Sequence, residues 1–194
     1  MTRLLALAAL LLAAPLALAQ DSLAIGDPVP LAAQSFETVG GGSLSLAAAA
    51  GESGLVVVMW SAVCPWTSRY EARMAQLYAT ATANGIGVVL VASNDPNRVT
   101  RTPEVLAATA AAVGAPMILD PTATLADALG ATQTPEAFFF DGGLLYSGAL
   151  DDSPADAERV TIQYLQQALD QHLAAQSVEI QRTTPFGCTI KRAR

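Results

Sequence analysis

An unbroken apolar run that leads into a cysteine and a proline is the feature that most constrains this chain. Residues 54–60 begin with glycine and continue Leu-Val-Val-Val-Met-Trp, a β-branched run with no polar face. Such a run is typical of a strand buried on both faces in a central parallel sheet. Cys64 and Pro65 follow closely, and proline is favoured at the first position of a helix. The sequence therefore predicts that Cys64 lies where a buried strand passes into a helix.

Strand and helix patterns alternate along the rest of the chain. They predict a helix over 65–84, a buried strand over 86–92, a helix from Thr102 to about Gly114, a short extended piece at 117–119 and a helix from the Asp120-Pro121 cap to Leu129. A hairpin is expected over 136–146 and a last helix over 155–175, while apolar pieces at 23–25, 31–33 and 44–46 predict a small N-terminal hairpin. This order predicts an α/β, thioredoxin-like three-layer fold. Its central mixed sheet would have parallel strands and a C-terminal antiparallel hairpin, with helices on both faces and an N-terminal β extension.

The first 19 residues have the pattern of a secretory signal peptide. Arg3 precedes an apolar run too short to span a bilayer comfortably, and Ala17 and Ala19 form an A-x-A cleavage site. Cleavage is expected after Ala19, with an uncleaved membrane anchor as the alternative. The expected organisation is therefore a signal peptide at 1–19, a thioredoxin-like domain at 20–175 and a C-terminal tail at 176–194. We expect a periplasmic or secreted protein with no stable membrane anchor.

Charge and cysteine content exclude several classes of function. The chain has 10 basic and 17 acidic residues, a balance that disfavours nucleic acid as a partner. Its two cysteines and one histidine cannot assemble a structural zinc site or a c-type haem motif. We therefore expect no metal or cofactor, and we interpret His172 as a solvated residue on a polar helix face.

Cys64 is the main candidate for chemistry. A cysteine reacts as its thiolate, and the unpaired amides in the first turn of a helix stabilise that anion. Active sites of α/β proteins also form at the carboxyl ends of parallel strands. The alternative is a buried cysteine that acts as a small apolar residue.

The residues around Cys64 resemble the active-site loop of the thioredoxin-like redoxins, the group that includes alkyl hydroperoxide reductase and the thiol-specific antioxidant proteins. The loop reads Trp-Ser-Ala-Val-Cys-Pro-Trp-Thr over 60–67. A subgroup with a single Cys-Pro cysteine is matched further by Tyr70-Glu71 and Arg73, by Thr134-Pro135-Glu136, by Asp151-Asp152, and by Gly-Cys-Thr-Ile-Lys at 187–191. The resemblance implies that Pro135 is a cis-proline beside the reactive cysteine that presents backbone groups to a thiol partner. From the sequence alone, an ordinary trans turn is equally possible there.

Two departures from the family pattern narrow the chemistry. Dithiol oxidoreductases of this fold have a second cysteine three positions after the first, where this chain has Thr67. Peroxidases have a serine or threonine three positions before the cysteine, which Ser61 matches, but also a proline seven positions before it, where Val57 stands. We expect the hydroxyls of Ser61 and Thr67 to hydrogen-bond the thiolate. Copper-handling relatives need a CxxxC pair, and Ser68 occupies that position.

Cys188 is the other cysteine, and the sequence leaves three arrangements open for it. It could condense with a sulfenic acid on Cys64 to form a redox-active disulfide, it could form a permanent structural disulfide, or it could remain unpaired. A disulfide requires α-carbons within about 7 Å of one another, which no sequence pattern establishes.

Several neighbours of Cys64 have both a functional and a structural interpretation. Arg69 and Arg73 are candidates to stabilise a thiolate but are expected to be solvated, and Glu71 is a candidate proton acceptor but is expected to be a surface charge. Trp60 is expected in the core, while Trp66 could shape an apolar surface for a protein thiol. The polar residues Asn94, Asp95 and Asn97 are expected to form a capped turn.

Two functions are in accord with these patterns. The first is an exported thiol-based oxidoreductase of the redoxin class that acts on peroxide or on protein thiols and disulfides, with Cys64 as nucleophile and Cys188 as candidate resolving thiol. The second is a non-catalytic binding module that uses the surface around Cys64 and Pro135 to hold a partner.

Overall fold

The computed structural model describes residues 23–99 and 102–193. The predicted signal peptide and its cleavage site lie outside the described residues. The strands are β1 (Phe36–Glu37), β2 (Ser43–Leu44), β3 (Leu55–Met59), β4 (Gly87–Ala92), β5 (Met117–Leu119), β6 (Gln133–Thr134), β7 (Glu136–Asp141), β8 (Gly143–Gly148) and β9 (Cys188–Thr189). The α-helices are α1 (Leu46–Ala49), α2 (Pro65–Ala83), α3 (Pro103–Val113), α4 (Thr124–Leu129) and α5 (Tyr164–Leu173), and a short 3-10 helix covers Ala157–Arg159.

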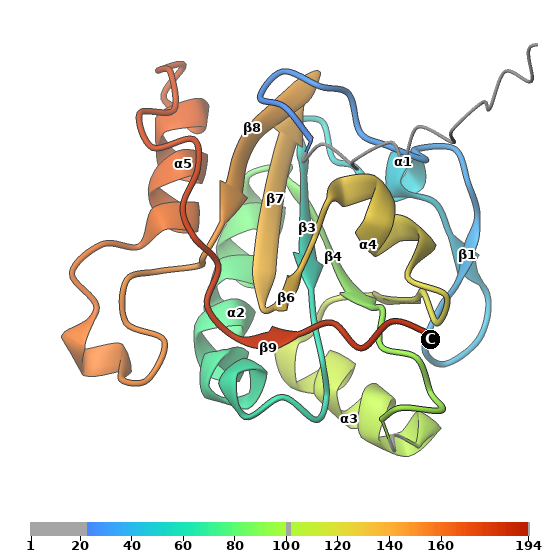
Figure 1. Cartoon of the computed structure of the whole chain (residues 1–194). Coiled ribbons are helices and arrows are strands. Elements are labelled where there is room, and N and C mark those ends of the chain that lie inside the picture. The colour runs from blue at the N-terminus through green and yellow to red at the C-terminus, as the bar shows by residue number, and fades with distance from the viewer. Residues whose placement is uncertain (1–22, 100–101, 194) are drawn as a thin grey trace, which may run out of the picture.

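A five-stranded mixed sheet forms the centre of the molecule, in the order β5-β4-β3-β7-β8 (Figure 1). Strands β3, β4 and β5 run parallel, with Val57 beside Val89, whereas β7 runs antiparallel to β3 and places Phe138 beside Val57. The hairpin of β7 and β8 completes the sheet. This is the predicted thioredoxin-like arrangement, with parallel strands first and an antiparallel hairpin last.

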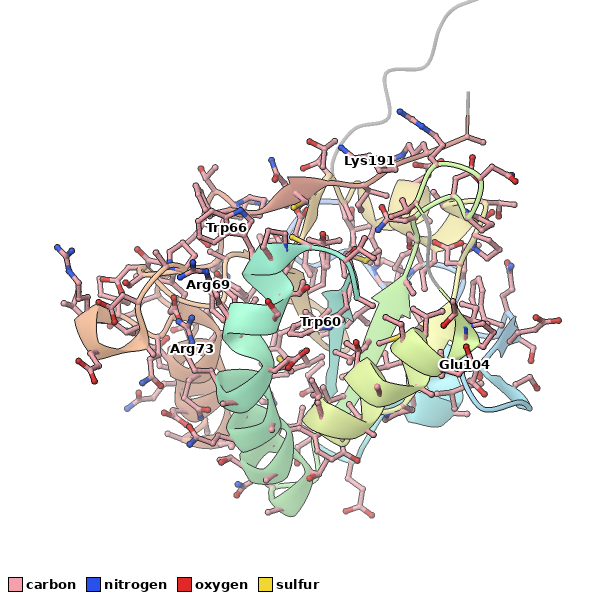
Figure 2. All side chains as sticks on the ribbon, turned by 90° about the horizontal axis from the view of Figure 1, so that it is seen from below. Trp60, Trp66, Arg69, Arg73, Glu104 and Lys191 are labelled. Carbon is pink, nitrogen blue, oxygen red and sulfur yellow. The ribbon has the colours of Figure 1, made fainter. Side chains whose placement is uncertain are left out.

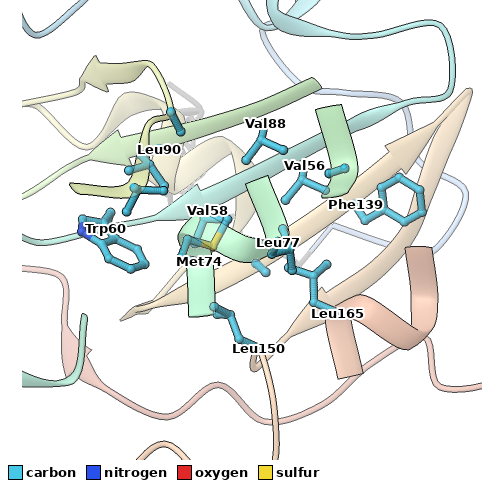
Figure 3. Packing of buried hydrophobic residues seen from close by; sticks show 14 of the residues in the cluster. Val56, Val58, Trp60, Met74, Leu77, Val88, Leu90, Phe139, Leu150 and Leu165 are labelled. Carbon is cyan, nitrogen blue, oxygen red and sulfur yellow. The ribbon is translucent and has the colours of Figure 1, made fainter. Parts of the chain in front are cut away.

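Each face of the sheet carries its own hydrophobic core. On one face, Val56, Val58 and Trp60 of the central segment pack against residues of α2, α3 and α5, including Met74 and Leu77 (Figure 3). On the other face, alternate residues of the same strands pack against α1, α4 and the N-terminal hairpin. All five residues of β3 are buried, which confirms the strand predicted from its continuous apolar sequence.

Helix α2 begins at the predicted position. Cys64 is its N-cap residue and Pro65 takes the first helical position, where its missing N–H costs nothing. The helix ends at Ala83, and the chain turns at Asn84 and Gly85, where Gly85 adopts a positive φ of 75°. The strand-to-helix placement of Cys64 is thus present in the structure.

Three predicted elements differ from the structure. The N-terminal hairpin exists, but its strands are β1 and β2; the predicted pieces at 23–25 and 31–33 are not strands, and Leu46 of the third piece begins helix α1. Helix α4 begins only at Thr124, although the Asp120 carboxylate still accepts the amides of Leu125 and Ala126 at 3.1 Å.

The last helix is also shorter than predicted, because α5 begins only at Tyr164. The segment before it is a loop held by side chains. The Asp152 carboxylate accepts the amide of Thr161 at 2.9 Å, and the Asp152 amide donates to the Ile162 carbonyl at 3.1 Å. These contacts, together with β-branched residues at 160–162, outweigh the helical pattern there.

In the described part of the chain, no helix combines the length and the apolar character that crossing a membrane requires.

Candidate redox site

The site lies at the edge of the sheet where β3 and β4 end and β7 begins. Met59 at the end of β3 pairs with Glu136 at the start of β7. Cys64 therefore follows β3 at the same edge at which Asn94 follows β4 and Pro135 precedes β7. The Thr134–Pro135 peptide bond is cis, and the Cys64 thiol donates to the Thr134 carbonyl at 3.3 Å.

The C-terminal segment brings Cys188 to Cys64. Figure 1 shows β9 crossing the lower edge of the sheet, past β6 and the start of α2. β9 pairs antiparallel with β6 so that Cys188 lies beside Thr134. The two cysteines are free thiols that hydrogen-bond with an Sγ–Sγ distance of 2.6 Å. Because a disulfide bond is about 2.05 Å long, only a small movement separates the two sulfur atoms from bond formation.

The part of the chain that carries Cys188, residues 181–192, is called the strap below. Upstream of Cys188 it is attached to β8 and to the residue that follows β8. The Ser147 amide donates to the Gln181 carbonyl at 2.9 Å, and the Thr183 amide donates to the Ser147 carbonyl at 3.0 Å. The Thr183 hydroxyl also accepts the amide of Ala149 at 2.9 Å.

Downstream of Cys188 the strap is attached to the loop after β4 and to the region around α4. Both backbone groups of Lys191 are held: its amide donates to the Asn94 side-chain oxygen at 2.8 Å, and its carbonyl accepts the Asp95 amide at 2.7 Å. The Ile190 side chain is buried in the core on the α4 side of the sheet, and Arg192 forms an ion pair with Asp127 at 2.6 Å. The strap is thus fixed on both sides of Cys188 without a covalent bond.

The pKa values of the two thiols shift in opposite directions. Burial raises the pKa of Cys64, but hydrogen bonds from the Cys188 thiol, the Thr67 and Trp66 amides and the Thr134 side chain outweigh it, so that the pKa lies below its usual value. Burial and the neighbouring Cys64 raise the pKa of Cys188 to about 11. The pair can therefore hold one negative charge on Cys64, with Cys188 as the hydrogen-bond donor.

The hydroxyls of Ser61 and Thr67 do not have the predicted role. The Thr67 hydroxyl donates to the backbone carbonyls of Ser61 and Cys64, the latter at 2.7 Å. The Ser61 hydroxyl accepts the side-chain amide of Asn94 at 2.8 Å. Both side chains therefore hold the loop around Cys64. The contribution of Thr67 to the lowered pKa of Cys64 comes from its backbone amide. Short hydroxyl side chains commonly hydrogen-bond to nearby backbone carbonyls, and here Thr67 does so in place of the cysteine sulfur.

Asn94 lies in the predicted turn after β4, at the same edge of the sheet as Cys64, but its contacts were not predicted. It is buried and links Ser61 of the active-site loop to Lys191 of the strap. The predicted turn is present at Asp95, which accepts the Asn97 amide at 2.9 Å, but Asn94 itself joins two segments that are distant in sequence. The sequence signal for Asn94 is its position after a buried strand, because polar residues there lie at the same edge of the sheet as Cys64.

Glu136 belongs to the matching Thr134-Pro135-Glu136 stretch, but its role was not predicted from the sequence. It is buried, and its carboxylate accepts the amides of Thr132 and Gln133 at 2.8 and 3.0 Å, which fixes the loop that carries β6. Burial raises the pKa of this carboxyl group, and the two amides partly offset that effect. The residue thus supports the backbone that faces both cysteines.

Arg73 is not the solvated residue that was expected. Its guanidinium group forms an ion pair with the buried Asp151 and lies 3.9 Å over the ring of Tyr70. Tyr70 in turn donates to Asp151 at 2.8 Å. Arg69 donates to the Ala155 carbonyl at 2.8 Å. The two arginines thus hold the loop after β8 against α2. Tyr70, Arg73 and Asp151, which match the family subgroup in sequence, therefore have a structural role in this network.

Aromatic side chains flank the cysteines on the outside. Trp66 in the first turn of α2 packs edge-to-face against Phe186 of the strap, with ring centroids 4.7 Å apart. Figure 2 shows Trp66, Arg69 and Arg73 in succession along one side of α2, with Lys191 on the strap. Trp60, in contrast, is fully buried as predicted.

Two further expectations concerned polar groups. His172 is half-buried: its ring packs against Phe139 with centroids 5.3 Å apart and lies 3.3 Å from the Asp141 carboxylate, so it is not simply solvated. Glu71 is half-buried on α2.

Within residues 23–99 and 102–193, no cluster of three or more His, Cys, Asp or Glu residues could hold a metal ion.

Comparison with known proteins identifies the family. The model of the AhpC/TSA family matches residues 25–146, which is more than half of the chain and includes Cys64 and Pro135. The chain belongs to the AhpC/TSA family. The matched region ends before the strap, so Cys188 lies outside the part that the AhpC/TSA model describes.

Solved structures share the fold of this chain. A hypothetical protein from Sinorhizobium meliloti is 28% identical with a TM-score of 0.79, over 89% of this chain and 97% of that chain. An uncharacterised conserved protein from Geobacillus kaustophilus is 26% identical with a TM-score of 0.75, over 86% and 93% of the two chains. A secreted Mycobacterium tuberculosis disulfide oxidoreductase homologous to DsbE shares the fold, with 15% identity and a TM-score of 0.53 over 73% of this chain and 95% of that chain. Among curated protein sequences, none matches significantly.

Proposed function

We propose that this AhpC/TSA-family protein is an exported thiol oxidoreductase that cycles between two free thiols and a Cys64–Cys188 disulfide. The observation that carries the proposal is the Sγ–Sγ distance of 2.6 Å between cysteines that are 124 positions apart in the sequence. The export part of the proposal rests on the sequence pattern of residues 1–19.

Cys64 is the nucleophile in this proposal. Its pKa lies below the usual value because four hydrogen-bonding groups outweigh the effect of burial, and a thiolate is the reactive form of cysteine. The Thr134 side chain is one of these four groups. The neighbouring Pro135 shapes this stretch of backbone, while Ser61 and Thr67 hold the loop on which Cys64 lies.

Cys188 is the resolving thiol in this proposal. The raised pKa keeps it protonated at neutral pH, so it can donate its proton when Cys64 carries the charge. A purely structural disulfide would be expected where a segment needs a covalent bond to stay in place. The strap instead has hydrogen-bond anchors on both sides of Cys188 and does not depend on a disulfide for its position, which favours a reversible pair.

The test is mass spectrometry of the reduced protein before and after a stoichiometric pulse of hydrogen peroxide, with digestion in the absence of reductant. The expected result is a Cys64–Cys188 linked peptide that appears only after the pulse and disappears with dithiothreitol. Cys64→Ser and Cys188→Ser proteins are the matched controls, because each lacks one of the two sulfur atoms.

Two results would overturn the proposal. Cysteines that stay reduced, with Cys64 no more reactive than free cysteine, would indicate a binding module. A linked peptide that is present before the pulse and resists mild reductant would indicate a structural disulfide.

A further inference from the structure

A cavity lies between α2 and the part of the chain that follows β8, outside the redox site. Its volume is about 420 Å³, within the range of about 300–1,000 Å³ that is typical of ligand pockets. Neither cysteine lines it, and its α2 wall extends to Thr80, which follows Cys64 by 16 positions. Because a helix rises about 1.5 Å per residue, Thr80 lies roughly 24 Å along α2 from Cys64. A ligand could therefore occupy this cavity without contact with the redox pair.

The floor of the cavity is apolar. Leu77 of α2 and Leu150 after β8 line it and are only 8% and 7% exposed. The half-buried Val160 and the small, exposed Ala157 belong to the same lining. An apolar group of a ligand would lose its contact with water here, which favours binding.

The two charged residues of this lining neutralise one another. Figure 2 shows Arg73 on the side of α2 that faces the segment after β8, where it pairs with Asp151. Arg73 also donates to the carbonyls of Ser153 at 3.1 Å and Pro154 at 3.4 Å, and Asp151 accepts the Tyr70 hydroxyl at 2.8 Å. A charged ligand would thus lose its hydration without gaining a free counter-charge, which disfavours its binding.

Three polar side chains of the lining are unpaired within the described part of the chain. Gln76 and Thr80 belong to α2, and Gln163 is the N-cap residue of α5. Their side chains form no hydrogen bond with residues 23–99 or 102–193, and Gln163 does not cap its own helix. A carboxamide offers an acceptor and two donor hydrogens, as a peptide group offers one of each. The cavity therefore presents groups that match a peptide backbone on two of its walls.

A second cavity continues the first along α5. Its volume is about 360 Å³, and Gln163 and Gln166 line both cavities. Gln167 and Gln171 are among its other lining residues, so that carboxamides continue along the surface of the helix. Asp170 is the one charged residue of its lining, and it accepts the Gln166 side-chain amide at 2.7 Å. The two cavities together form an elongated, uncharged depression, which is called the groove below.

We propose that the groove binds an extended, uncharged peptide segment of another protein, with one apolar side chain seated against Leu77 and Leu150. An extended backbone supplies alternating donors and acceptors to the glutamines, while the apolar floor selects the side chain. A glycan is also uncharged, but a sugar ring stacks on exposed aromatic faces, and the one aromatic residue in the lining, Tyr70, is 2% exposed. This site is additional to the proposed redox function and does not depend on it.

The test uses the full-length reduced protein and synthetic peptides. Pools of acetylated, amidated heptapeptides vary six positions among Gly, Ala, Ser, Thr, Asn and Gln, and each pool has a fixed central residue: Leu, Val, Ala, Asp or Lys. Immobilised protein selects peptides from each pool, and mass spectrometry identifies them. Fluorescence polarisation of the labelled best binder then measures its Kd. Chitotetraose, an uncharged glycan, is the comparison ligand.

The expected result is binding from the pools with Leu or Val at the centre, because the floor is apolar, and none from the pools with Asp or Lys. Gln76→Ala and Gln163→Ala each remove one free carboxamide and should weaken binding about fivefold, and together about 25-fold. Ala157→Phe should abolish binding, because the larger side chain fills the cavity. All three residues are exposed, so these changes leave the core intact. Gln34→Ala is the matched control: Gln34 is an exposed glutamine that lines neither cavity, and its loss should leave the Kd unchanged.

Three results would overturn the proposal. The first is that no selected peptide has a Kd below about 1 mM, and the second is that the best binder has the same Kd for the groove variants as for the unaltered protein. The third is that chitotetraose binds, and is lost in the groove variants, while no peptide does. The Cys64–Cys188 bond should form after a peroxide pulse in every variant, since the groove does not include either cysteine, and this keeps the test separate from that of the redox function.

Discussion

Cys64 and Cys188 share a hydrogen bond but differ in the protonation state that their surroundings favour. The amides of Trp66 and Thr67 in the first turn of α2 lower the pKa of Cys64, because N–H groups at a helix start lack partners within the helix. Cys188 lies on a short strand and has the Cys64 charge beside it, which raises its pKa to about 11. The opposite pKa shifts make Cys64 the nucleophile and Cys188 the proton donor, so no other residue is needed as a base.

Removing the Cys188 thiol should raise the pKa of Cys64. Among the groups that lower this pKa, Cys188 is the largest contributor, so Cys188→Ala should raise it, and Cys188→Ser, which keeps a hydroxyl donor, should raise it less. The rate of Cys64 alkylation falls as pH decreases through its pKa, since protonation removes the thiolate. The midpoint of the rate against pH should therefore move to higher pH in the alanine variant. An unchanged midpoint in Cys188→Ala would contradict the assignment.

The strap and the loop after β4 act together at the scale of elements. Asn94 lies at their junction, because it binds Ser61 beside the nucleophile and Lys191 beyond the resolving thiol. Sequence periodicity predicted β4 and the turn after it, but it carried no information on the contact, since residues 94 and 191 meet only through the tertiary fold. The same is true of β9, a two-residue strand too short to produce an alternating pattern.

Asn94→Ala should slow the second half of the cycle. A hydrogen bond contributes about 1 kcal/mol net, so loss of the Lys191 contact should lower the rate of Cys64–Cys188 bond formation roughly fivefold. Dimedone would then trap correspondingly more Cys64 sulfenic acid after a peroxide pulse. Ser93→Ala is the matched control: Ser93 is also buried, and its hydroxyl donates to Asp120 at 2.7 Å and not to the strap. Equal trapping in the two variants would show that Asn94 acts only through general stability.

At the scale of the whole molecule, the fold follows from patterns with strong periodicity. The continuous apolar sequences of β3 and β4, the helical stripe of α2 and the Asp-Gly-Gly turn between β7 and β8 predicted the sheet and its layers. Residues 155–163 were predicted as helix and are mainly a loop, because Asp152 holds their backbone from outside the segment. Cys64 could be selected from its place in the sequence. The position of Cys188, the roles of Ser61 and Thr67, and the network of Arg73 could not, because each depends on a partner distant in the chain.

The central claim is that Cys64 and Cys188 form one reversible redox couple, and redox titration tests it most directly. The reduced protein is equilibrated in glutathione buffers of graded composition, quenched by alkylation, and analysed for the linked peptide. Structural disulfides have potentials below about −300 mV. Because hydrogen bonds stabilise the Cys64 thiolate in the reduced state, we predict a single transition of the Cys64–Cys188 bond at a potential above about −300 mV. A bond that stays intact throughout, or separate glutathione adducts on the two cysteines with no linked peptide, would contradict the account.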